Sequence, residues 1–387
     1  MKWKFYSLAF VAGMSILTAC SSDDNNDNDG NGNGNEIENG TILKGTITSD
    51  VTLAAGNTYK LSGEYIVEEG ATLHIEEGVK IIAVYDDIAD YILVKQGGKI
   101  NAVGTPDKPI VMTSEKEEPG AWGGIHICGR AHTNAEGGKG SSEIGGAVYG
   151  GNDDADNSGT LQYIRLEYTG FAFDEEHEAN GISFYGVGNG TIVDHCQAYK
   201  GSDDGFEFFG GSVNVSNLVA VSCSDDSFDW TEGWNGKGTN LVAYQEAEST
   251  LGYDCDCLME CDNNGSNNAA TPVAHPVLKN LILVGNGGSK QGIRLRAGTE
   301  VEIDNAKVCG KGQPLTVETA LTENALKNGT SKLTNITLTS ELSCKEGIYT
   351  HADFIAVTSN KVDANLSYSS FEDIRKECSW MNGSWVK

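Results

Sequence analysis

From residue 40 onward, short apolar runs alternate with polar positions and are separated by Gly, Asn and Asp. The runs are rich in β-branched residues and have no sustained 3.6-residue period, so they predict strands rather than helices. Glycines between the runs, as at Gly70 and Gly78, are typical of tight corners at positive φ. In the first part of the chain we expect strands at residues 41–47, 59–67, 71–75, 79–84, 91–94 and 99–103.

Two phrases repeat further along the chain. Asp-Asp-small-Phe-acid-aromatic occurs at residues 203–208 and 225–230, with starting points 22 residues apart. An Asn followed by apolar residues recurs at spacings of 23, 40, 25 and 30 residues. Its copies are at Asn217, Asn240, Asn280, Asn305 and Asn335. These spacings indicate one structural coil of about 22–25 residues, lengthened in places by insertions.

Coils made of strands predict an all-β protein, a parallel β-helix spanning residues 41–387. We expect loop insertions near 131–159 and 246–275, and a C-terminal cap. Many short strands are also typical of a sandwich or barrel, but the repeats favour the solenoid. In such a coil each repeated Asn would occupy a corner and hydrogen-bond to its neighbour along the stack.

Stacking has consequences for the 22-residue repeat. Equivalent residues of successive coils lie about 4.8 Å apart. We therefore expect Phe206 to lie over Phe228, and Phe208 over Trp230, with the rings facing inward.

The acids of the same repeat would then stack on the outer face. We call these six carboxylates the acid ladder: Asp203, Asp204, Glu207, Asp225, Asp226 and Asp229. No Lys or Arg occurs between residues 201 and 236, so the cluster requires raised pKa values or a cation. Calcium is the candidate cofactor, because carboxylates and turn carbonyls supply its oxygen ligands. In the alternative, the aspartates are turn residues that accept backbone N–H groups and the outer acids are solvated.

Catalytic candidates are sparse. Glu207 and Asp229 are candidate carboxylates for glycoside hydrolysis. Arg294 and Arg296 alternate with apolar residues and so project to one face of a strand. They are candidates for the base of a uronate lyase or for binding a carboxylate. The commoner role for such arginines is to offset nearby acids.

Aromatic and cysteine residues supply further candidates. Trp234 and Phe209 are candidate platforms for sugar rings, and the alternative for each is ordinary core packing. Nine cysteines follow Cys20, an odd number. In an exported protein we expect disulfides, with Cys261 paired to Cys255 or Cys257 and with Cys344 tied to Cys378.

The beginning of the chain indicates export. Residues 1–19 carry two lysines and then an apolar run too short to span a bilayer, as in a signal peptide. Residues 17–20, Leu-Thr-Ala-Cys, resemble the lipobox of bacterial lipoproteins, which implies lipidation of Cys20. Residues 20–40 are almost entirely Asn, Asp and Gly, and predict a disordered tether. Acids directly after the Cys resemble the surface-export signal of Bacteroidetes lipoproteins and imply exposure on the outer membrane; a periplasmic destination is the alternative.

The net charge limits the choice of partners. The chain carries −28, and removing residues 1–19 leaves 25 basic against 55 acidic residues, or −30. So negative a surface excludes nucleic acid and a polybasic membrane patch, and favours cations or neutral and basic partners.

Several segments carry a family resemblance. Residues 63–104, 109–114 (Pro-Ile-Val-Met-Thr-Ser), 120–125 (Gly-Ala-Trp-Gly-Gly-Ile) and 202–211 resemble right-handed, single-stranded parallel β-helix lipoproteins of marine and gut bacteria. These proteins are relatives of the pectate-lyase-like superfold. The resemblance covers about residues 45–340 and implies a right-handed coil. It implies little about activity, because a shared fold does not carry a shared function.

Taken together, these features predict a cell-surface lipoprotein whose β-helix binds a glycan or another extracellular partner, with calcium and without catalysis. The first alternative is a calcium-dependent polysaccharide lyase or glycoside hydrolase. The second is a structural or adhesion component of the cell surface.

Overall fold

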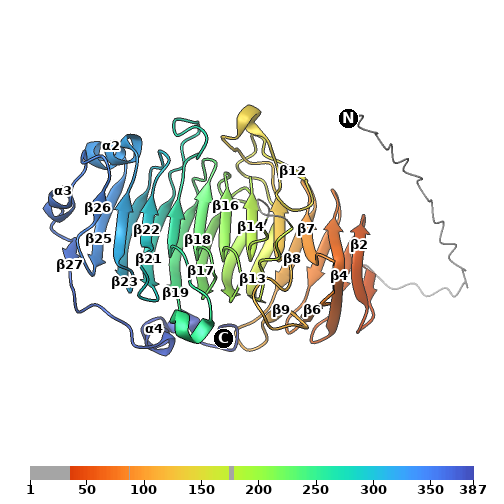
Figure 1. Ribbon diagram of the computed structural model, residues 1–387. Coiled ribbons are helices and arrows are strands. Elements are labelled where there is room, and N and C mark those ends of the chain that lie inside the picture. Colours follow the sequence, from red (N-terminus) through yellow and green to blue (C-terminus); the bar gives the residue numbers. More distant parts are fainter. Residues whose placement is uncertain (1–34, 87, 174–177) are drawn as a thin grey trace, which may run out of the picture. The chain divides into compact units, whose positions relative to one another are not determined.

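The computed structural model describes residues 35–86, 88–173 and 178–387. Its chain winds into a solenoid in which each strand pairs in parallel with its equivalent one coil later (Figure 1). The stacked strands form three rows along the solenoid axis. The predicted signal peptide, Cys20 and the predicted tether up to residue 34 lie outside the described residues.

The first row carries the candidate site. It runs through β7 (Tyr91–Val94), β10 (Ile125–Cys128), β14 (Ile182–Tyr185), β16 (Phe206–Phe209), β18 (Phe228–Thr231), β20 (Met259–Cys261), β22 (Gln291–Leu295), β24 (Gln313–Val317) and β26 (Ser343–Cys344).

The other two rows share long strands that bend at a corner. These are β13 (Gly159–Glu167), β15 (Ile192–Tyr199), β17 (Asn214–Val221), β19 (Lys237–Tyr244), β21 (Val277–Val284), β23 (Glu302–Cys309) and β25 (Lys332–Leu338), followed by β27 (Lys361–Val362). The first coils comprise β1 (Asn35–Ile37), β2 (Ile42–Ile47), β3 (Val51–Leu53), β4 (Thr58–Val67), β5 (Thr72–Ile75), β6 (Lys80–Ala83), β8 (Lys99–Val103) and β9 (Ile110–Ser114).

Short elements decorate the loops and the C-terminal end. They are η1 (Glu136–Gly138), the antiparallel pair β11 (Gly140–Ser141) and β12 (Val148–Tyr149), α1 (Glu248–Leu251), α2 (Ala320–Asn328), α3 (His351–Ala356), α4 (Phe371–Glu377) and η2 (Ser379–Met381). Among the described residues, no helix has both the length and the apolar character needed to cross a membrane.

The predicted strands between residues 41 and 103 are confirmed to within one residue at each end. Gly70 and Gly78 turn their corners at φ +85° and +72°. Two boundaries are corrected. Strand β1 pairs with β3 and so extends the solenoid into the segment expected as tether. The segment 246–275 is not an insertion throughout, because β20 within it pairs with β18 and β22 as a regular rung.

Aromatic rings fill the interior of the first row. Phe206 stacks on Phe228 with ring centroids 5.6 Å apart, as predicted. Phe208 is in register with Trp230, but its ring stacks on Trp234 at 4.1 Å. Trp234, in the turn after β18, also belongs to the main core, and its ring centroid lies 5.8 Å from that of Trp230.

An asparagine ladder forms the corner between the second and third rows. Asn240 Nδ2 donates to Asn217 Oδ1 (2.8 Å), Asn280 Nδ2 to Asn240 Oδ1 (3.0 Å), and Asn305 Nδ2 to Asn280 Oδ1 (2.9 Å). All four residues have φ between +56° and +64°, a region that Asn tolerates better than most residues. The predicted corner role of the repeated Asn is confirmed. Asn335 differs, since its Nδ2 donates to Asp304 Oδ1 instead (2.6 Å).

Residues 363–387, which we call the C-terminal strap, run back along the outer face of the third row (Figure 1). Ile374, Met381 and Trp385 pack there on outward-facing apolar residues such as Val242 and Ile282. These strands are therefore buried on both faces. Near the end of the strap, the backbone N–H of Ser384 donates to the carbonyl oxygen of Pro106 (2.8 Å).

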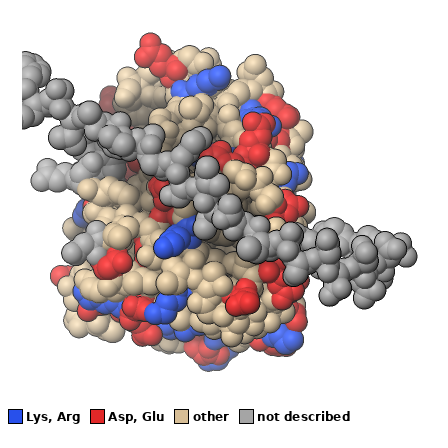
Figure 2. Space-filling view, turned by 90° about the vertical axis from the view of Figure 1, so that its right-hand side faces the viewer, with Lys and Arg blue, Asp and Glu red and all other residues tan. Residues whose placement is uncertain are grey.

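Charged side chains are interspersed on the surface at the end of the solenoid where the described chain begins. In the view of Figure 2, Asp and Glu lie close to Lys and Arg around this end. Ion pairs such as Lys60–Glu115 (2.8 Å) and Lys108–Glu77 (2.8 Å) join side chains of different coils here. Part of the negative charge of this end is therefore paired.

Replacing one stacked ring tests how far the core depends on this packing. Phe208 is 2% exposed and lies between Phe184 (5.0 Å) and Trp234 (4.1 Å). Phe208→Ala should lower the free energy of unfolding by about 3–5 kcal/mol, because it leaves a cavity among rings. Urea unfolding measures this change. The control Ile192→Ala, at a side chain that is 55% exposed, should change it by less than about 0.5 kcal/mol; equal effects would contradict the prediction.

Candidate functional site

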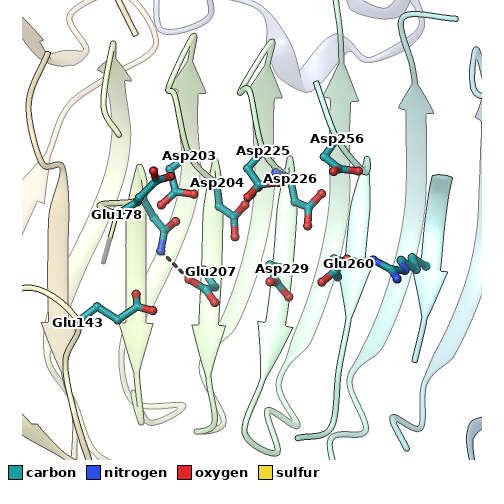
Figure 3. A pocket seen from close by; sticks show the side chains of 12 residues that line it. Glu143, Glu178, Asp203, Asp204, Glu207, Asp225, Asp226, Asp229, Asp256 and Glu260 are labelled. Atoms are coloured by element: carbon teal, nitrogen blue, oxygen red, sulfur yellow. Dashed lines mark hydrogen bonds and ion pairs between the residues drawn. The ribbon is translucent and has the colours of Figure 1, made fainter. Parts of the chain in front are cut away.

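An open cleft of about 430 Å³ lies on the outer face of the first row (Figure 3). We call it the acidic cleft, because ten of its twelve lining residues are Asp or Glu. The lining residues are Glu143, Glu178, Asn180, Asp203, Asp204, Glu207, Asp225, Asp226, Asp229, Asp256, Glu260 and Arg294. The structure therefore brings the whole predicted acid ladder together in one cleft.

One row of side chains, which we call the strand row, crosses the cleft along the solenoid axis. Glu207 on β16 is in register with Asp229 on β18, which is in register with Glu260 on β20. Arg294 on β22 occupies the next rung. These positions alternate with the buried aromatic residues, so they face outward. The predicted register of Glu207 and Asp229 is confirmed.

A second row lies at the corner that precedes these strands. Asp204 accepts the backbone N–H of Asp226 (2.8 Å), and Asp226 accepts that of Cys257 (2.6 Å). Both aspartates are 5% exposed. The turn role that the sequence left open is thus real for these two residues. Each still has a second carboxylate oxygen in the cleft wall.

Crowding and burial raise the pKa of all six acids of the acid ladder. Burial, followed by the charge of Asp225, raises the pKa of Asp203 to about 7. Burial also raises the pKa values of Asp204, Glu207, Asp226 and Asp229 well above their usual range, with neighbouring carboxylates adding to the effect. Among the described residues, none of the six has an ion-pair partner.

Two groups of carboxylates, each joining one corner aspartate to two acids of the strands, have the spacing of metal ligands. Oxygens of Asp204, Glu207 and Asp229 lie within 4.8 Å of one another, as do those of Asp226, Asp229 and Glu260. Asp229 belongs to both groups. Its Oδ1 atom is buried and has no hydrogen-bond partner among the described residues. An oxygen in that position requires a proton or a cation.

Basic side chains from later coils neutralise only one end of the cleft. Arg294 donates to Glu260 (2.8 Å) and Glu318 (3.2 Å). Arg296 donates to Asp262 (2.7 Å) and pairs with Glu260. Both arginines therefore serve to offset acids, the role that the sequence favoured. The strand row runs from unpaired acids at Glu207 to paired ones at Glu260.

Comparison with known families decides the classification of this fold. A family model described as a pectate-lyase like beta helix domain matches residues 45–386. The chain belongs to the pectate-lyase-like β-helix family. The predicted class, a right-handed single-stranded parallel β-helix, is thereby confirmed. No curated protein and no solved structure matched the chain. The match extends beyond the expected residue 340 and includes the C-terminal strap.

Several cleft residues of this family member were missed by the sequence analysis. Glu260 continues the strand row, and the run Met-Glu-Cys at 259–261 repeats the alternation of Phe-Glu-Phe at 206–208. That alternation was the available signal. Glu143 comes from the insertion after β10, and no local pattern marks it. Glu178 follows residues 174–177, which lie outside the described ranges, and no repeat marks it.

The two predicted sugar platforms are wrong. Trp234 is 1% exposed and stacks on Phe208 inside the main core. Phe209 is 8% exposed and stacks on Tyr185 at 4.4 Å in a separate apolar cluster. Phe209 is buried because Ile144 and Tyr149 of the insertion after β10 share its apolar cluster, and Trp234 is buried because its ring points from the turn after β18 into the main core.

The predicted disulfides are absent, and all nine cysteines in the described ranges are free thiols. Cys261 belongs to the main core, whereas the Sγ of Cys257 donates to Asp256 beside the cleft (3.4 Å) and Cys255 is buried in the preceding loop. Cys344 packs on the main core and Cys378 on the cluster beneath the strap. The predicted partners thus occupy different packing environments.

Stability should depend on pH through the acid ladder. These acids have a higher pKa in the folded protein than in the unfolded chain, where it is about 4. The folded state therefore binds more protons, and its stability falls as the pH rises from about 4 through 7. In EDTA, calorimetry should give a lower Tm at pH 8 than at pH 5. Asp229→Asn should reduce this difference; an unchanged difference would contradict the assignment.

Proposed function

We propose that the protein is a surface-anchored lipoprotein whose acidic cleft binds calcium and, through the ion, an extracellular glycan. The Asp229 carboxylate carries the proposal, because its buried Oδ1 has no partner among the described residues and because it offers an oxygen to both groups of acids whose ligand atoms lie within 4.8 Å of one another. A cation there would replace the missing hydrogen bond and offset the repulsion along the ladder.

The donor set favours calcium over smaller or softer ions. All ligand atoms in the two groups that contain Asp229 are carboxylate oxygens, the ligands of a hard cation. Calcium takes six to eight oxygens in variable geometry, whereas magnesium requires near-octahedral geometry and gives up water reluctantly. The residues that would hold the ion are Asp204, Glu207, Asp226, Asp229 and Glu260. Because the cleft is open to solvent, coordination positions would remain for hydroxyl or carboxylate oxygens of a glycan.

Binding is favoured over lyase chemistry by the state of the two arginines. A lyase requires a base that removes the proton next to a uronate carboxyl. Desolvation lowers the pKa of the Arg294 guanidinium, but its hydrogen bonds to Glu318 and Glu260 outweigh that effect and raise the pKa. The guanidinium therefore holds its proton more firmly. The pKa of Arg296 is raised in the same way by Asp262 and Glu260, against the desolvation that lowers it. Neither suits proton abstraction.

Calcium titration tests the cleft. Isothermal titration of the purified protein should give a Kd of about 0.1–1 mM, the range of extracellular modules. Ten millimolar calcium should stabilise the fold by about 2 kcal/mol. Asp229→Asn should weaken binding by at least about tenfold, because it removes the shared ligand charge. Glu136→Gln, at an exposed acid outside the cleft, serves as the matched control and should bind as the wild type does.

Two results would contradict the proposed function. One is titration of Asp229→Asn with the wild-type Kd, which would place any calcium elsewhere. Alternatively, incubation with uronate and neutral polysaccharides in calcium would release unsaturated products or new reducing ends, which would make the protein an enzyme.

The anchor is tested by substitution of Cys20. When the gene is expressed in a bacterium that lipidates its proteins, labelled palmitate should enter the wild type, and the wild type should sediment with membranes. Cys20→Ser should carry no label and stay soluble, because a thiol is required for attachment. Proteinase added to whole cells should digest the wild type if the solenoid is exposed; protection would favour the periplasmic alternative.

A further inference from the structure

A second groove lies on another side of the solenoid, between the asparagine ladder and the C-terminal strap. It has a volume of about 180 Å³, and its wall includes the ladder residues Asn240, Asn280 and Asn305. Trp380, in η2 of the strap, lies on the opposite side together with Glu377. None of these residues lines the acidic cleft.

The ladder leaves hydrogen-bonding groups available to a ligand. A side-chain amide has two N–H donors and an oxygen that accepts two hydrogen bonds. Within the ladder Asn280 donates once, to Asn240, and accepts once, from Asn305. It therefore keeps one donor and one acceptor, and it is exposed. The rungs repeat about every 4.8 Å, so the groove wall offers evenly spaced amide groups.

Trp380 provides a fixed aromatic surface facing these amides. Its ring is half-buried and is braced by Trp385, whose ring centroid is 6.2 Å away, and by His195 at 6.4 Å. The bracing side chains restrict the indole, so little conformational entropy is lost when a ligand packs on it. An aromatic face opposite polar amides matches the apolar face and hydroxyl edge of a pyranose ring.

Charge in this groove is balanced, unlike charge in the acidic cleft. Lys307 pairs with Glu377, which also accepts a hydrogen bond from Tyr368 (2.8 Å). The groove thus presents no unpaired charge from these residues, and it needs no cation. Its volume is below that of sites for drug-sized ligands, about 300–1,000 Å³, and suits a single ring.

We propose that this groove is a calcium-independent subsite for one neutral pyranose unit of a glycan, stacked on Trp380 and hydrogen-bonded by the asparagine ladder. The subsite stands independently of the acidic cleft. It would allow the protein to hold a neutral polysaccharide on one side of the solenoid while the cleft engages cations on another.

Binding in EDTA tests the subsite. The probes are neutral hexasaccharides of glucose, galactose, mannose and xylose, titrated into the purified protein by calorimetry and followed by tryptophan fluorescence. At least one should bind, and Trp380→Ala should weaken it by at least about tenfold through loss of the stacking surface. Trp380→Phe should recover part of the affinity. Asp229→Asn should leave the affinity unchanged.

A matched pair of ladder variants separates recognition from stability. Asn280→Gly removes two ladder hydrogen bonds, and Asn217→Gly removes one ladder hydrogen bond and one to Asp194; both keep the backbone free to adopt positive φ. Of these two residues Asn280 lines the groove and Asn217 does not, so Asn280→Gly should weaken binding and Asn217→Gly should not. Equal loss in both variants, undiminished binding by Trp380→Ala, or no binding by any probe in EDTA would overturn the proposal. None of these results would affect calcium binding in the acidic cleft.

Discussion

In-register stacking of parallel strands is the constraint on which this structure depends. Each coil places its residues about 4.8 Å above their equivalents in the preceding coil, so like residues stack on like. For aromatic rings and amides this is favourable, and Phe206 over Phe228 and the asparagine ladder follow from it. For carboxylates the same geometry is unfavourable, because Glu207 over Asp229 brings like charges together.

In the acidic cleft, the repulsion between stacked carboxylates is offset by different groups along the row. Toward the C-terminal end the strand row acquires its own counter-charges, with Arg294 and Arg296 on Glu260. Toward Glu207 and Asp229 it does not. Backbone N–H groups satisfy part of Asp204 and Asp226, as ordinary turn aspartates would be satisfied. What remains is a short stretch whose stability depends on protonation or on a cation, and this marks it as a candidate functional site.

The C-terminal strap changes which faces are available for binding. It covers the apolar outer side of the third row, where Val242 and Ile282 would otherwise be exposed, whereas the acidic cleft on the first row stays open. It also creates the second groove, because Trp380 is brought beside an asparagine ladder formed 75 or more residues earlier in the chain. The two candidate sites therefore arise differently: one from repetition within the coil, the other from a segment folded back onto it.

The same contrast, between features repeated in each coil and segments packed onto the coils, separates what the sequence revealed from what it did not. Features that repeat from coil to coil, such as the strands, the corner asparagines, the facing of Phe206 and the gathering of the acid ladder, were readable, because stacking converts sequence period directly into spatial proximity. Contacts between segments without a common period were not. The burial of Trp234, the separation of Cys344 from Cys378, the approach of Glu143 to the cleft and the course of the strap depend on where irregular loops pack. That packing is decided by shape and burial across the whole solenoid, so only the tertiary structure specifies it.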